Sequence, residues 1–263
     1  MHRTLKWFCS CAKLSVSQNQ PKSLLNKHKL AIALAKLSHA RKEQASEDFI
    51  HLSIAQRSLV ILFSGYGAII HPKRADLVAN SSELLDGVVL DFLLFIMKAH
   101  PQGKELLFKR PQITQATLNE AWSCGKHTFG DAYAQFMGTR AFSPQERPLV
   151  RFIANPDLAY VAARLRESHD FWHVLFGCST SVLSELKLKQ IEFYYTSFPS
   201  AGLSYVLAPI RLSLKNRSLL SVHFRSRKQV AGARNDLLFL FIENRLHVPL
   251  ISLRKKLMVK AYN

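Results

Sequence analysis

The stretch NPDLAYVAARLRESHDFWHVLFG, residues 155–177, predicts one long helix and is the clearest element of the sequence. Asn155 offers a side-chain cap, a proline follows at the first helical position, and Gly177 supplies a left-handed stop. Between these ends the apolar residues recur at steps of three and four, as in a helix with one face in a core. His169 and His173 occupy positions on that face. The stretch therefore predicts a buried helix that carries two histidines inward.

The rest of the chain has the same character, because apolar runs of helical length are separated by Pro, Gly and Asn, and strict alternation is scarce. We expect helices over 53–69, 74–81, 83–99, 114–122, 127–139, 156–176, 180–197 and 200–215, and two or three more between 217 and 259. A chain of 263 residues, 48% of them hydrophobic, is long enough for one sizeable core. The prediction is an all-α, single compact multi-helix domain over 46–263.

The N-terminal part of the chain is strongly basic. The whole chain carries 36 Lys and Arg against 18 Asp and Glu, a net charge of +18, and its first acid is Glu43. A cationic, acid-poor segment with scattered Leu and Ala is typical of a mitochondrial transit peptide. We therefore interpret 1–45 as a disordered basic leader. A solvated basic tail is the alternative interpretation.

Composition and spacing argue against several classes of protein. The four cysteines show no paired spacing, which disfavours a disulfide framework or a thiolate zinc site. The longest apolar runs are too short or too interrupted for a membrane span of about 20 residues, although a basic surface suits peripheral binding to anionic lipid. There is no zinc-finger, RRM or KH pattern, so we expect no nucleic-acid partner.

The inward face of the long helix carries groups that bind metal ions. His169 and His173 lie one turn apart, and Asp170 is about 100° round the helix from His169. Glu185 is out of reach in a continuous helix. If the chain reverses after Gly177 as a helical hairpin, however, Glu185 faces the two histidines. The sequence thus predicts a metal site between the two helices of a hairpin.

Other interpretations of these residues stay open on spacing alone. A buried histidine is often a hydrogen-bonded core residue, and Glu192, one heptad after Glu185, is a competing carboxylate. Ordinary ion pairs at helical spacing would account for the acids just as well. Those pairs are Asp170 with Arg166 and Glu185 with Lys189.

The pattern HDxxHx(11)E, formed by His169, Asp170, His173 and Glu185, resembles the signature of the fourth coenzyme Q biosynthesis protein, a mitochondrial family. Further blocks resemble those of the family in the same order, from about residue 51 to the C terminus. These blocks are HPKRADLVA (71–79), RPQI (110–113), TFGDAYAQFM (128–137), FSPQERPLVRFI (142–153), NPDLAYVAARLRESHD (155–170), LAPIRLS (207–213) and ENR (243–245).

The resemblance implies a zinc site made by His169, Asp170, His173 and Glu185, which are also the expected catalytic residues. A set of nitrogen and oxygen ligands equally suits Fe(II) or Mn(II). Four protein ligands normally make a closed structural site, whereas catalytic zinc keeps one position open. Asp170 is therefore our candidate for a group that orients a histidine instead of binding the ion.

The resemblance also implies an activity, that of a carbon–carbon lyase in ubiquinone biosynthesis. The expected reaction is C1-decarboxylation of 4-hydroxy-3-methoxy-5-polyprenylbenzoate to 2-methoxy-6-polyprenylphenol, with an oxidative variant that leaves a C1 hydroxyl. The alternative is a non-catalytic, zinc-bearing, lipid-binding scaffold. The expected partners are other coenzyme Q biosynthesis proteins in a multi-subunit complex and the lipid of the mitochondrial inner membrane on its matrix side. A homodimer is compatible with this role.

Overall fold

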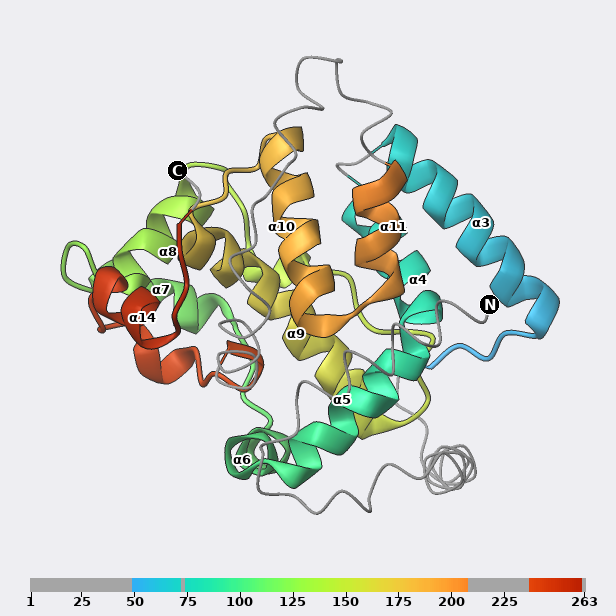
Figure 1. Ribbon diagram of the computed structural model, residues 1–263, viewed down its shortest axis with the longest axis horizontal. Helices are drawn as coiled ribbons and strands as arrows, with labels where there is room; N and C mark the ends of the chain where they lie inside the picture. Colours follow the sequence, from blue (N-terminus) through green and yellow to red (C-terminus); the bar gives the residue numbers. More distant parts are fainter. Residues whose placement is uncertain (1–48, 72–73, 208–236, 262–263) are drawn as a thin grey trace.

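The computed structural model describes residues 49–71, 74–207 and 237–261 (Figure 1). Within these ranges the regular structure is helical, and the pairing of extended backbone is limited to an isolated bridge between Thr128 and Pro249. The expected all-α class is therefore confirmed. The predicted leader over 1–45 lies outside the described residues.

Helix α9, Pro156–Phe176, lies at the centre of the molecule and has the bounds that its sequence predicts. The side chain of Asn155 accepts hydrogen bonds from the backbone N–H groups of Asp157 and Leu158, and Gly177 ends the helix at a φ of 66°. A positive φ is the conformation in which glycine costs least. Both ends of the helix are thus set by local chemistry.

Shorter helices surround α9, which packs against α5, α8 and α10. Their bounds are α3 Ile54–Ile70, α4 Ala75–Leu85, α5 Gly87–Ala99, α6 Pro101–Lys109, α7 Gln115–Ser123, α8 Phe129–Gly138, α10 Val182–Thr196, α11 Pro199–Leu207 and α14 Leu250–Lys256, with 3-10 turns η3 Pro144–Glu146 and η6 Glu243–Arg245. Most predicted helices are found within a few residues of their expected ends. Of the helix predicted over 200–215, the part beyond Leu207 lies outside the described residues, as does 217–236.

Helix α6 was not predicted, because Pro101 and Gly103 both suggest a loop. In the structure α5 ends at Ala99, and the extended backbone of the next residue, His100, allows Pro101 to serve as the first residue of a new helix. A Cβ at Gly103 would lie 2.4 Å from the carbonyl oxygen of Met97. The glycine therefore permits a close approach between α6 and the end of α5.

One hydrophobic core joins these helices. On α9 the ring of Phe171 stacks on that of Tyr133 from α8, with ring centroids 3.9 Å apart, and also contacts Phe129. All three side chains are fully buried. Because aromatic rings bury large areas, this cluster fixes α8 against the half of α9 that carries the histidines.

Buried ion pairs tie distant segments to α9. The guanidinium of Arg164, which is 2% exposed, donates to both carboxylate oxygens of Glu243 in the C-terminal segment, at 2.6 and 2.9 Å. Arg166 donates to Glu83 of α4 at 2.8 Å. Removing one partner would leave an uncompensated buried charge, so these pairs fix where the segments lie.

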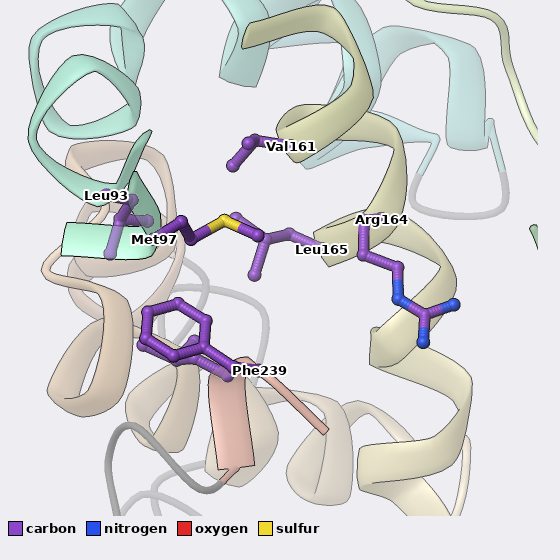
Figure 2. Close-up of a pocket in the computed structure, with 7 residues that line it drawn as sticks. Leu93, Met97, Val161, Arg164, Leu165 and Phe239 are labelled. Carbon is purple, nitrogen blue, oxygen red and sulfur yellow. The ribbon is translucent and has the colours of Figure 1, made fainter. Parts of the chain in front are cut away.

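A small cavity lies between α5, α9 and the segment at Leu238 and Phe239 (Figure 2). It is lined mainly by Leu93, Met97 and Val161, and its volume is about 10 Å³. That is room for about one water molecule and not for a prenyl chain. Figure 2 also shows Arg164 at one side of the cavity, with its guanidinium pointing away from the apolar side chains.

Candidate metal centre

The candidate site lies where α9 and α10 form a helical hairpin. His169 and His173 sit one turn apart near the C-terminal end of α9, and Glu185 lies in the first turn of α10. The turn between the helices is closed by a hydrogen bond from the backbone N–H of Cys178 to the carbonyl of His173, and Ser181 caps α10. The reversal after Gly177 that the sequence prediction required is therefore present.

Three of the predicted residues converge. The Nε2 atoms of His169 and His173 are 3.1 Å apart. The carboxylate oxygens of Glu185 lie 3.2 Å from Nε2 of His173 and 3.8 Å from Nε2 of His169. Within the described residues these three are the group of His, Cys, Asp or Glu side chains close enough together to hold a metal ion, with their ligand atoms all within 4.8 Å of one another.

The other ring nitrogens of both histidines are engaged. Nδ1 of His173 lies 3.0 Å from the carbonyl oxygen of Cys178, which only accepts, so this nitrogen carries the proton. Nδ1 of His169 lies 2.5 Å from the Glu192 carboxylate, and the same reasoning makes it the donor. In their neutral forms both rings therefore direct an unprotonated Nε2 at the other ring and at Glu185.

Glu192 is held in turn by Lys189, whose Nζ donates to its second carboxylate oxygen at 2.6 Å. Burial acts to raise the pKa of Glu192, but the charges of Lys189 and His169 outweigh it and hold the pKa below its usual range. Burial acts to lower the pKa of His169, but the carboxylates of Glu192 and Glu185 outweigh it and the pKa is raised. The site is therefore a compact network of buried, opposed charges.

Glu185 is the most accessible of the three converging residues, with a side chain 35% exposed against 23% for His169 and 2% for His173. Burial acts to raise its pKa, yet the neighbouring His173 and His169 lower the pKa overall. The carboxylate is thus ionised at neutral pH. A ligand that approaches from solvent meets Glu185 first.

Asp170 lies apart from this cluster. Its carboxylate accepts from Arg147 at 2.7 and 3.1 Å, and the same guanidinium donates to the hydroxyl of Tyr133. The ion pair between Arg147 and Asp170 thus connects the segment after η3 to α9. The sequence suggested Asp170 as the acid that orients a histidine and Glu192 only as a competing carboxylate. In the structure it is Glu192 that accepts a hydrogen bond from a histidine, His169.

The sequence suggested ion pairs at helical spacing between Asp170 and Arg166 and between Glu185 and Lys189. In the structure these residues have other partners. Asp170 pairs with Arg147 and not with Arg166, which binds Glu83 instead. Lys189 pairs with Glu192, although its charge also acts on Glu185. One signal in the sequence does point to Glu192, since a spacing of seven residues places it on the same face of α10 as Glu185.

Aromatic residues form one wall of the site. The ring of Phe136 stacks on that of His173, with centroids 4.9 Å apart, and the guanidinium of Arg140 lies 4.2 Å from the centroid of Phe136. Arg140 also donates to Thr180 in the turn before α10. The wall restricts the rotation of His173 and places a positive charge near the site.

The three converging groups fit a zinc ion. Zn–N bonds of about 2.0–2.1 Å in a tetrahedral site separate neighbouring ligand atoms by about 3.3 Å. The Nε2–Nε2 distance of 3.1 Å and the 3.2 Å between Glu185 and His173 are close to this edge length. Two unprotonated nitrogens this close repel each other unless a cation or a proton lies between them. The donor set is therefore suited to a divalent cation.

Comparison with known proteins agrees with the signature in the sequence. A family model described as coenzyme Q (ubiquinone) biosynthesis protein Coq4 matches residues 47–263. The chain is 34% identical over 213 residues, 80% of each protein, to the mitochondrial ubiquinone biosynthesis protein COQ4 homologue of Bos taurus. It is 35% identical over 176 residues to the mitochondrial COQ4 protein of Coprinopsis cinerea, which covers 66% of this chain and 60% of that relative.

The fold has a counterpart among solved structures. The crystal structure of a candidate ubiquinone biosynthesis protein from Nostoc punctiforme superposes with a TM-score of 0.58, covering 76% of this chain and 97% of that chain. At 20% sequence identity this likeness concerns the fold alone. The family match and the identity to the mitochondrial relatives carry the assignment. The chain therefore belongs to the Coq4 family of coenzyme Q (ubiquinone) biosynthesis proteins.

Proposed function

We propose that this protein catalyses the metal-dependent removal of the C1 carboxyl group from 4-hydroxy-3-methoxy-5-polyprenylbenzoate. The observation that carries the proposal is the convergence of His169, His173 and Glu185. Their closest ligand atoms are 3.1, 3.2 and 3.8 Å apart, and the first two distances are close to the edge of a tetrahedral zinc site. Three protein ligands with one open position are typical of catalytic zinc, whereas four are typical of structural zinc. This difference favours a catalyst over a scaffold.

His169, His173 and Glu185 would hold the ion, and Glu192 would fix the ring of His169. A bound divalent cation would supply positive charge for the carboxylate of the substrate. The ligands also suit Fe(II) and Mn(II). Asp170, which the resemblance places among the ligands, pairs with Arg147 in the structure and would contribute by fixing the helix that carries the histidines.

The substrate supplies the electrons for the reaction. C1 lies para to the 4-hydroxyl, so the phenolate pushes electron density onto C1, which takes up a proton. The C1–carboxylate bond then breaks, its electron pair returns to the ring, and CO2 leaves. The protein has to orient the ring and deliver one proton. Glu185 is ionised and the most exposed of the three, so we assign it the relay of that proton from water to C1.

The cellular setting belongs to the same proposal. The Coprinopsis and Bos taurus relatives are named mitochondrial, and the sequence has a basic N-terminal segment. We place the protein on the matrix side of the mitochondrial inner membrane, in a complex with other coenzyme Q biosynthesis proteins. A polyprenylated substrate supports this placement, because such a molecule resides in the bilayer.

The test is elemental analysis of protein purified without chelators, followed by incubation with the prenylated acid in the presence and absence of oxygen. We expect one metal ion per chain and release of CO2. His173→Ala and Glu185→Ala should lose both. His247→Ala is the matched control, since His247 also contacts a carboxylate, that of Glu120, but is 67% exposed and distant from the cluster.

The outcomes separate the two candidate functions. A wild-type protein without bound metal would overturn the metal centre itself. A folded Glu185→Ala protein that retains its protein partners and still decarboxylates fully would overturn the catalytic role and favour the zinc-bearing scaffold. If product forms only with oxygen and carries a C1 hydroxyl, the oxidative reaction replaces the simple one.

A further inference from the structure

Helix α3 exposes a continuous apolar face. Leu62, Phe63 and Tyr66 are 67%, 71% and 66% exposed, and Leu59 and Ile70 extend the same stripe. At 100° per residue these five positions fall within an arc of about 100°. The opposite side of the helix packs on α4, where the side chain of Leu77 approaches Gly67 closely. The stripe is therefore an outer face of the molecule and not part of its core.

Helix α11 adds a second apolar patch. Leu203, Val206 and Leu207 are exposed and lie within a similar arc of that helix. Both α3 and α11 pack against α4, and both lie toward the upper right of the molecule in Figure 1. We call these eight side chains, Leu59, Leu62, Phe63, Tyr66, Ile70, Leu203, Val206 and Leu207, the α3–α11 face. Large apolar side chains exposed on two helices that pack on the same third helix are typical of an interaction surface.

The sequence of α3 and α11, taken with the segment that follows α11, is basic. Helix α3 contains no acid and a single base, Arg57, and α11 contains no charged residue at all. The segment 208–236, which follows directly after Leu207, carries seven Lys or Arg and one Asp. An apolar face on a chain with a net charge of +18 is complementary to a surface that combines hydrocarbon with negative charge.

The length of the helices determines how they would meet such a surface. In the part of the chain that the structure describes, no helix is long and apolar enough to cross a membrane. A helix with a wide apolar stripe and few charges can instead lie in the plane of the interface, with that stripe among the acyl chains. Phe63 and Tyr66, at the centre of the stripe, are aromatic residues, a class that is favoured at the membrane–water interface.

We propose that the α3–α11 face docks the protein onto an anionic lipid bilayer. This inference rests on the membrane location in the proposed function and names the surface that provides it. Helix α11 packs on α10, which carries Glu185, so docking would hold the metal centre one helix away from the lipid that contains the substrate. The active site would thereby receive a ring whose prenyl tail stays in the membrane.

A second copy of the chain is the competing occupant of this face. A twofold pairing would bring together two chains that each carry a net charge of +18. Like charges opposed in this way repel, whereas an anionic bilayer attracts both. The charge distribution therefore favours lipid over self-association.

The experiment measures the sedimentation of the full chain with vesicles of equal parts phosphatidylcholine and phosphatidylglycerol. The test variant combines Leu62→Ser and Phe63→Ser, which remove apolar side chains without touching the core or the metal centre. We expect the partition coefficient to fall by roughly tenfold or more, because each buried apolar side chain contributes about that factor. Phe108→Ser, at an 88% exposed position on α6, is the matched control and should bind like the wild type.

Further measurements make each outcome decisive. Binding should weaken on vesicles of phosphatidylcholine alone and with added salt. Equal binding by the double variant and the wild type would overturn the proposal, since the basic segments alone would then explain attachment. A wild-type dimer that the double variant converts to a monomer, with vesicle binding unchanged, would assign the face to a second copy. Metal content and decarboxylation in detergent should not change in the variant, so a failure of the proposed chemistry is distinguishable from a failure of docking.

Discussion

At the scale of single residues, Glu192 decides which way His169 presents Nε2, the nitrogen that would bind the proposed metal ion. Its carboxylate accepts a hydrogen bond from Nδ1 of His169 at 2.5 Å. The other carboxylate oxygen accepts a hydrogen bond from Lys189. Carboxylates in this position set the tautomer and raise the basicity of a ligating histidine. Helix α10 thus carries two separate acids at this site: Glu185 faces Nε2 of both histidines, and Glu192 faces Nδ1 of His169.

The first prediction is that Glu192→Gln weakens Zn²⁺ binding by about 10–100-fold, because a neutral acceptor orients the ring less firmly and leaves the Lys189 ammonium unpaired. Competition with a chromophoric chelator measures the affinity. Glu105→Gln removes an equal charge from an exposed pair with Lys109 and should leave the affinity unchanged. Equal affinities for the Glu192 variant and the wild type would show that the acid does not orient the ligand.

The second prediction concerns Asp86, which is 2% exposed and accepts two hydrogen bonds from Ser200. Burial raises its pKa to about 7 from an ordinary value of 3.8. Because the folded-state pKa is the higher one, this carboxyl destabilises the fold progressively as pH rises from about 4 to about 7, and by a constant amount above that. Asp86→Asn should therefore increase the free energy of unfolding at pH 8, by up to about 4 kcal/mol, with no gain near pH 4.

Urea denaturation across this pH range tests the sign. The contrasting variant is Glu83→Gln, since Glu83 is equally buried but accepts from Arg166 and from the backbone N–H groups of Arg151 and Phe152. Its neutralisation should lower the free energy of unfolding at pH 8, because it leaves the Arg166 guanidinium unpaired. Destabilisation by Asp86→Asn at pH 8 would contradict the burial argument.

At the scale of elements, the packing of α6 on α5 depends on Gly103. The atoms nearest to a Cβ at this position belong to the backbone of Met97, at 2.4 to 2.9 Å, and a backbone cannot rotate away as a side chain does. Gly103→Ala should therefore lower the free energy of unfolding by about 1–3 kcal/mol. Chemical denaturation at one pH is sufficient to measure this.

Gly87→Ala is the control for that prediction. Gly87 begins α5, and a Cβ there meets no atom within 4 Å. Alanine at this position should be neutral or stabilising by up to about 1 kcal/mol, because it restricts the unfolded chain. If both glycine variants behaved alike, the close approach of α6 to α5 would not be the reason for Gly103.

At the scale of the whole molecule, a metal ion bound between α9 and α10 should stabilise the entire fold. Binding to the folded state alone adds about 2.7 kcal/mol when the free ion is at 100 times its Kd. For a chain of this size that corresponds to a rise in Tm of about 5–10 °C. Differential scanning fluorimetry with and without Zn²⁺ measures it.

His173→Ala should abolish that rise in Tm, because it removes the most deeply buried ligand of the cluster. His247→Ala should retain it, since its ring lies outside the cluster. A rise that is the same in all three proteins would mean that zinc binds elsewhere on the chain.

Local patterns were sufficient for much of the fold. The cap at Asn155, the stop at Gly177 and the apolar period between them fixed α9 to the residue, and the same period placed both histidines inward. Helix α6 was missed because a proline and a glycine that usually signal a loop here begin a helix and permit a close contact. The close contact of Gly103 with Met97 is a packing contact between two helices, so the local sequence pattern does not predict it.

The sequence by itself determined the helical class, the long buried helix and the inward direction of His169 and His173, because these follow from the helical repeat and from backbone preferences at its ends. Only the tertiary structure decided which acids serve the site. Arg147, 23 residues before Asp170 and outside any helix, draws that carboxylate away, and the hairpin turns Glu185 and Glu192 toward the histidines. Spacing along one helix cannot reveal such partners, since they arrive from other segments through packing.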